Sequence, residues 1–168
     1  MMFLRSIFEW VDAFPSSIAI RESQYVYASL LTSHVIGMCV FAGLIVMMDL
    51  RLLGVGNRRT SFSQIQRRLF PWQMLGMAVS ATTGLVLVYA DPLRFYDNIF
   101  FWIKAVMMVL AGVNAMAFHQ LTYRTVDAWN TETVMPFGAK LASAMSLVLW
   151  AGVVVSGRLI AYNWFERR

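Results

Sequence analysis

The sequence predicts an all-α integral membrane protein, a four-helix up-down-up-down bundle preceded by a short interfacial helix. Of its 168 residues, 59% are hydrophobic and only 14% are charged, with a mean hydropathy of +0.60. Four apolar stretches reach or approach the roughly 18 to 20 residues that cross a bilayer as a helix. Aromatic residues gather near the ends of these stretches, where amphipathic rings lie at headgroup depth.

We expect one membrane domain over residues 1–168. Its first element, residues 2–14, carries apolar side chains at spacings of three and four, with Arg5, Glu9 and Asp12 between them. This pattern is typical of a helix lying in the membrane interface, and Pro15 is expected to end it. The four spans are expected at residues 23–48, 69–90, 98–120 and 140–162.

Small residues recur at four-residue spacing in the predicted spans, for example Gly76, Ser80 and Gly84 in the second. Lipid provides no hydrophobic drive for helices to associate, so close backbone approach at such stripes matters more than in water. We therefore expect the four spans to pack as a compact bundle.

The connection between the first two spans, residues 49–68, holds five arginines, Arg58 and Arg59 among them, against one aspartate. The positive-inside rule places this connection in the cytoplasm, with both termini on the periplasmic side of a bacterial inner membrane. Asp49 and Arg51 are then expected to anchor the inner end of the first span.

Composition excludes several classes of protein. Cys39 is the single cysteine, so the sequence has no CxxCH site for covalent haem. The net charge of +5 comes from span-flanking arginines rather than from a continuous basic face, so nucleic acid is not an expected partner. No phosphate loop or paired zinc-binding histidines indicates a hydrolase, and the spans lack the interruptions typical of transporters.

Three segments are distinctive: DLRLLG at 49–54, GVNAMAFH at 112–119 and GRLIAY at 157–162. With the apolar segments around them, they resemble an uncharacterised family of small bacterial inner-membrane proteins, a domain of unknown function with four predicted spans. The resemblance covers nearly the whole chain after residue 17. It implies the four-helix fold and lends no established activity.

Five polar side chains inside the predicted spans are candidates for a cofactor site: His34, Lys104, Asn114, His119 and Arg158. An ionisable group at bilayer depth costs about 2 to 3 kcal/mol or more, so it is expected to pair, to snorkel or to serve a site. Imidazole is also an axial ligand of haem iron. We therefore expect the two histidines to bind haem b, with the cations meeting its propionates.

The two histidines are expected at different depths. By the rise per residue, His34 lies about 6 Å to the outer side of the first span's centre, and His119 about 15 Å to the inner side of the third's. Since these helices run parallel, roughly 20 Å of depth separates the rings, so one chain cannot hold one haem between them. A homodimer that pairs like histidines would stack two haems, as a non-catalytic electron route between the quinone pool and a periplasmic partner.

Alternatives stay open. Met107 or Met108 would pair with His34 at one haem, or another subunit of a larger complex would supply the missing ligand. Met38 with His34 is a remote candidate for copper. In a cofactor-free membrane anchor or scaffold, His34 would instead hydrogen-bond to a neighbouring hydroxyl, such as those of Ser33, Thr82 and Ser156.

Overall fold

The computed structural model describes residues 2–55, 61–126 and 135–162. Within them the chain is helical, which confirms the predicted all-α class. The elements in chain order are α1 (Met2–Asp12), α2 (Pro15–Glu22), α3 (Gln24–Leu52), α4 (Phe62–Ala90), α5 (Pro92–Tyr96), α6 (Ile99–Ala117), the π-helical turn η1 (Phe118–Thr122), the 3-10 turn η2 (Tyr123–Thr125) and α8 (Phe137–Leu159).

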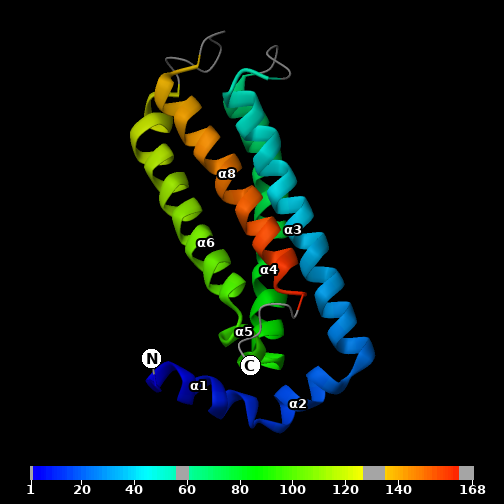
Figure 1. Ribbon diagram of the computed structural model, residues 1–168. Coiled ribbons are helices and arrows are strands. Elements are labelled where there is room, and N and C mark those ends of the chain that lie inside the picture. The colour runs from blue at the N-terminus through cyan, green and yellow to red at the C-terminus, as the bar shows by residue number, and fades with distance from the viewer. Residues whose placement is uncertain (1, 56–60, 127–134, 163–168) are drawn as a thin grey trace.

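Four helices in the described part of the chain are long and apolar enough to cross a membrane. They are α3, α4, α6 continued through η1, and α8, with lengths of 29, 29, 24 and 23 residues. Successive helices run in opposite directions and lie together in one bundle (Figure 1). The chain is therefore a multi-pass membrane protein with the predicted four-helix architecture.

The bundle consists of two antiparallel helix pairs, α3 with α4 and α6 with α8, which meet where α3 packs against α8. Figure 1 shows α8 lying between α3 and α6. Among the described residues, α4 and α6 make few contacts with each other. The side of the bundle between α4 and α6 is therefore its least closely packed side.

The α3–α4 pair is close because glycines of the two helices lie against the opposite backbone. A Cβ added to Gly37 would lie 2.9 Å from the backbone nitrogen of Ser80, and one added to Gly76 would lie 2.9 Å from that of Phe41. Neither backbone can move away without separating the helices. The small residues singled out in the sequence thus form this contact surface.

The N-terminal segment forms two helices where one was expected, and both lie across one end of the bundle (Figure 1). Pro15 begins α2 rather than only ending α1, because the first turn of a helix does not use the N–H that proline lacks. Phe3 and Trp10 of α1 are 79% and 66% exposed, as suits a helix in the membrane interface. We call the end that carries α1, α2 and α5 the outer end, and the opposite end the inner end.

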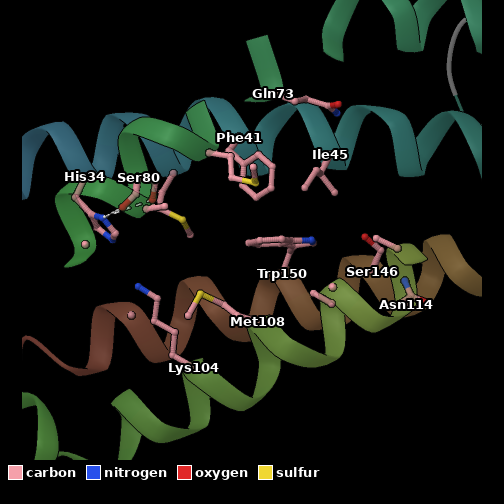
Figure 2. A pocket seen from close by; sticks show the side chains of 18 of the residues that line it. His34, Phe41, Ile45, Gln73, Ser80, Lys104, Met108, Asn114, Ser146 and Trp150 are labelled. Carbon is pink, nitrogen blue, oxygen red and sulfur yellow. Dashed lines mark hydrogen bonds between the residues drawn. The ribbon is translucent and has the colours of Figure 1, made fainter. Parts of the chain in front are cut away.

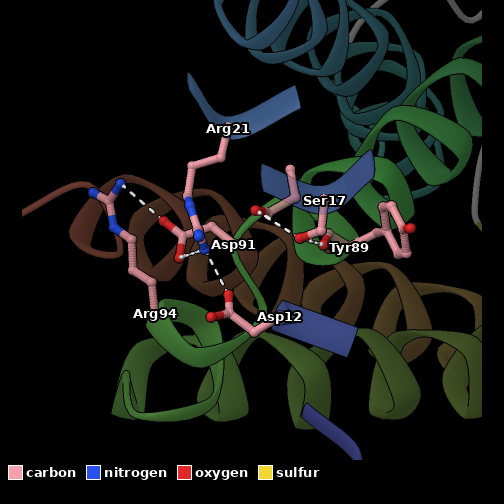
Figure 3. Close-up of polar contacts among 7 residues, drawn as sticks. Asp12, Ser17, Arg21, Tyr89, Asp91 and Arg94 are labelled. Atoms are coloured by element: carbon pink, nitrogen blue, oxygen red, sulfur yellow. Dashed lines mark hydrogen bonds and ion pairs between the residues drawn. The ribbon is translucent and has the colours of Figure 1, made fainter. Parts of the chain in front are cut away.

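Polar contacts fix α2 to the end of α4 (Figure 3). The fully buried Ser17 hydroxyl donates a hydrogen bond to the Tyr89 carbonyl at 2.8 Å. Arg21 donates to Asp12 at 2.5 Å and forms a longer ion pair with Asp91, at 3.8 Å. The N-terminal helices are therefore held to the bundle by specific side chains.

The inner end is closed by an apolar cluster of buried residues, Met48, Leu52, Phe62, Met135 and Ala139. Arg58 and Arg59, on which the predicted orientation depends, lie outside the described residues, as does the C-terminal stretch 163–168. The orientation of the bundle stays a prediction.

Candidate functional site

A cavity of about 990 Å³ lies inside the bundle, between the two helix pairs. Its middle is apolar and includes Phe41, Met108 and Trp150 (Figure 2). Two of its lining residues, Leu85 of α4 and Met108 of α6, are 73% and 42% exposed, so the cavity opens between these helices. Its volume is at the upper end of the roughly 300 to 1,000 Å³ of small-molecule sites.

His34 lines the outer part of this cavity, where its ring approaches α4 (Figure 2). Its Nδ1 lies 2.8 Å from the Ser80 carbonyl oxygen. Because a carbonyl only accepts hydrogen bonds, Nδ1 carries the proton, and Nε2 of the neutral ring keeps its lone pair. A backbone carbonyl that binds the other ring nitrogen is a common support of metal-bound histidine.

Hydroxyls also surround this ring, although not those named from the sequence. The Thr83 Oγ1 and Ser80 Oγ atoms lie 3.4 and 3.5 Å from Nδ1. Both contacts are longer than the one to the Ser80 carbonyl. The carbonyl is therefore the group that orients the ring.

Glycines lie beside His34 and Lys104, two of the polar side chains of the outer part. A Cβ added to Gly84 would lie 2.9 Å from Cε1 of His34, so the imidazole occupies space that only glycine leaves free. A Cβ added to Gly157 would lie 3.5 Å from the Lys104 nitrogen. Lys104 lines the cavity on the side opposite His34 (Figure 2), so an imidazole and a cation face each other across an apolar space.

The two methionines considered as partners of His34 differ in their surroundings. Met108 lines the cavity next to Lys104 (Figure 2). The sulfur of Met107 instead lies so close to Gly152 of α8 that a Cβ there would overlap it. Of the two methionines, Met108 is therefore the one placed to contact a ligand in the cavity.

The inner part of the cavity is polar as well. Asn114 donates from Nδ2 to the Ala142 carbonyl at 2.9 Å, which ties α6 to α8. Asp49 of α3 is only 7% exposed and hydrogen-bonds to Ser146 of α8. It is not the surface anchor expected from the sequence, because α3 continues to Leu52 and the apolar cluster covers the inner end.

The remaining two predicted site residues lie outside the cavity. His119, in η1, is exposed, and its ring stacks on Tyr123 with centroids 5.2 Å apart. Arg158 is exposed, donates to the Tyr162 hydroxyl at 3.1 Å and lies over its ring. The structure therefore gathers three of the five predicted residues in one cavity.

Haem and a bare metal ion require different numbers of ligands from the protein. No group of three or more His, Cys, Asp or Glu side chains in the described part of the chain is placed to hold an ion. Haem iron is already held by four porphyrin nitrogens and takes only axial ligands from the protein. An oriented imidazole, apolar walls and a nearby cation therefore fit haem.

Sequence reasoning missed several residues that shape the cavity. Ser80 and Gly84 belong to the small-residue stripe of α4, and their four-residue spacing could have indicated a face that receives a side chain from α3. For Asp49, Gln66 and Trp150 no pattern in the sequence shows that they line one cavity, because that depends on how the helices rotate and pack.

A search of curated proteins and a search of solved structures each found no match. Residues 7–163 match the model of a family described as a family of unknown function, DUF6644. That stretch includes all four membrane helices and the whole cavity. The resemblance seen in the sequence is thus confirmed, and the chain belongs to the family of unknown function DUF6644.

Proposed function

We propose that the chain is a membrane-embedded electron-transfer subunit of the bacterial inner membrane, which binds b-type haem in its cavity. It would pass electrons between the quinone pool and a periplasmic redox partner. One observation carries the proposal: the Ser80 carbonyl fixes the His34 tautomer that leaves Nε2 free to ligate iron.

The remaining groups around the cavity have separate roles in this proposal. Met108 of α6 would hold the haem together with His34, as in haem proteins with a His and Met pair. Lys104 and Arg94, which both line the cavity, would pair with the propionates. Phe41 and Trp150 exclude water from the middle of the cavity. The haem, once bound, supplies the reversible one-electron chemistry.

A homodimer that holds haem between two copies is the alternative arrangement. His119, exposed near the inner end, would then contribute to a second haem. His34 would have to leave its contact with α4 to reach the partner copy. The cavity arrangement requires no such change, so it is the one we propose.

The visible spectrum of the purified protein, expressed with ample haem, tests this function. We expect a reducible Soret and alpha band in the wild type and their loss in His34→Ala, because the ligand is removed. His119→Ala is the matched control, and it should keep the full haem content because His119 lies outside the cavity. Met108→Leu should keep haem and alter the alpha band, since only the second ligand changes.

Other outcomes would select other functions. Half the haem lost from each histidine variant would indicate the two-haem dimer. A colourless wild type, or a His34→Ala protein with full haem content, would contradict the cavity site. Colourless protein favours the second candidate, a cofactor-free anchor or scaffold subunit, whose exposed apolar residues contact other helices.

A further inference from the structure

The inner part of the cavity contains two buried acceptor atoms without hydrogen-bond partners among the described residues. They are Oδ2 of Asp49, on α3, and Oε1 of Gln66, on α4. Both side chains line the cavity, and Asp49 is 7% exposed. The Ser146 hydroxyl hydrogen-bonds to the Asp49 carboxyl, whose Oδ2 atom stays without a partner among the described residues.

Unpaired acceptors of this kind call for a donor. A buried polar atom without a partner costs about 1 to 3 kcal/mol, and more when it is charged. Two such atoms, on helices that pack against each other, are both relieved by one ligand group that donates hydrogen bonds. The head group that fits here is therefore a donor rather than a carbonyl.

From these acceptors toward the middle of the cavity, the wall becomes apolar and includes flat rings. Ile45 and Met74 line it, and the rings of Phe41 and Trp150 meet edge to face with centroids 5.0 Å apart. The opening between α4 and α6 lies among residues of the membrane spans, so a ligand enters from the lipid. The occupant must then be lipophilic.

This inner part is distinct from the imidazole end. Asp49 follows His34 by fifteen residues on the same helix, which corresponds to about 22 Å of rise. A ligand head group at Asp49 therefore does not compete with a group held by His34.

We propose that the inner part of the cavity binds a lipophilic hydroquinone, with one phenolic hydroxyl sharing its hydrogen between Oδ2 of Asp49 and Oε1 of Gln66 in a three-centre hydrogen bond. The reduced form should bind more tightly than the quinone, because quinone carbonyls only accept hydrogen bonds. The hydroquinone would be the electron donor in the proposed electron-transfer function. Only this role as electron donor rests on that proposed function. The binding site itself consists of protein side chains and needs no haem.

The test is a binding titration of the full chain in nanodiscs, with a short-tailed ubiquinol and the matching ubiquinone as probes. Tryptophan fluorescence reports binding, and Trp150→Phe identifies the part of the signal that comes from the cavity. We expect the wild type to bind the quinol about tenfold more tightly than the quinone, equivalent to about 1.4 kcal/mol. Asp49→Asn should abolish or reverse this preference, because the amide brings a donor.

Two further variants make the test specific. Gln66→Leu should weaken quinol binding and keep the fold, so it replaces Asp49→Asn if that protein misfolds. Asp97→Asn, an exposed site at the outer end, makes the same chemical change outside the cavity and should bind like the wild type. Circular dichroism and a single elution peak establish that each variant is folded.

Equal affinity for quinol and quinone in the wild type, or an unchanged preference in both inner-site variants, would overturn the inference. So would binding of dodecylammonium, a lipophilic amine that also donates hydrogen bonds, by a protein that does not bind the quinol. The haem spectrum is an independent measurement. Quinol binding by a colourless protein would contradict the electron-transfer function and support the quinol site. A haem-containing protein with no preference for quinol would support the electron-transfer function and contradict the quinol site.

Discussion

The two sides of α4 are built differently. Toward α3, Gly76 lies directly against the Gly37 and Phe41 backbones, and the helices are as close as backbones allow. Toward α6, the long side chains of Met77 and Leu85 line an open cavity. The same helix therefore makes a close backbone contact on one side and borders the cavity on the other.

This difference shows that the cavity is not a general failure of the helices to pack. Where small residues recur every four positions, α4 packs directly against α3. This stripe of small residues continues from Gly76 through Ser80 to Gly84. At Gly84 the stripe receives the His34 ring instead of a backbone. The small residues thus bring α4 into contact with α3 on one side, and Gly84 leaves room for the His34 side chain at the edge of the cavity side.

Gly76→Ala should disrupt the α3–α4 contact, which we call the closed side of α4, and have the largest effect on stability. The new Cβ would lie 2.9 Å from the Phe41 nitrogen and 3.0 Å from the Gly37 oxygen, so the helices must separate. Overpacking of this kind costs about 1 to 3 kcal/mol. Thermal unfolding in detergent, followed by circular dichroism, measures the loss.

Gly43→Ala on α3 is the matched control for that change, because a Cβ there meets nothing within 4 Å. It should leave stability unchanged or raise it by about 0.5 to 1 kcal/mol through helix propensity. Equal unfolding temperatures for the two alanine variants would show that α3 and α4 are not in backbone contact.

Much of this fold could be predicted from the sequence. Apolar length located the four spans, because lipid imposes that length on any spanning helix. The boundary of α4 could not be predicted in this way: it begins at Phe62 rather than near 69, since the polar turn with Arg67 and Arg68 continues the helix beyond the apolar window. The break at Pro15 was expected, whereas its role in starting α2 was not.

Gly84→Ala should have an intermediate effect, on the binding of the proposed haem rather than on the fold. Its Cβ would lie 2.9 Å from Cε1 and 3.2 Å from Nδ1 of His34, so the ring must leave the Ser80 carbonyl. Loss of such an orienting contact typically weakens metal binding about 10- to 100-fold. Haem titration of the apo protein, compared with Gly43→Ala, measures this change. Wild-type haem affinity in Gly84→Ala would contradict the role of the Ser80 carbonyl.

The site was less predictable than the fold. His34 and Lys104 could be singled out because charge and imidazole are costly in lipid, and both line the cavity. The same reasoning selected Arg158, which lies outside although its neighbour Gly157 lines the cavity. Adjacent residues of a helix point about 100° apart, so depth alone cannot tell which of two neighbours faces inward.

The smallest effect is expected where the closed side ends, at Asp91. Burial, acting against the nearby Arg94 and Arg21, raises the pKa of this carboxyl above its ordinary value of 3.8. A carboxyl with a raised pKa favours the folded state when protonated, so its contribution is complete below pH 3.8 and is lost as pH rises through the folded-state pKa. The ion pairs at 3.8 and 3.9 Å therefore do not fully offset the burial of this charge.

Asp91→Asn removes this titration and keeps the side-chain shape. The unfolding temperature of the wild type, relative to that of Asp91→Asn, should rise as pH falls from about 7 to about 4. Differences between the two proteins cancel the titration of the other carboxyls, which both share. If the relative stability of the wild type instead falls on acidification, the ion pairs outweigh burial, and the outer end of the closed side is held by charge rather than by packing.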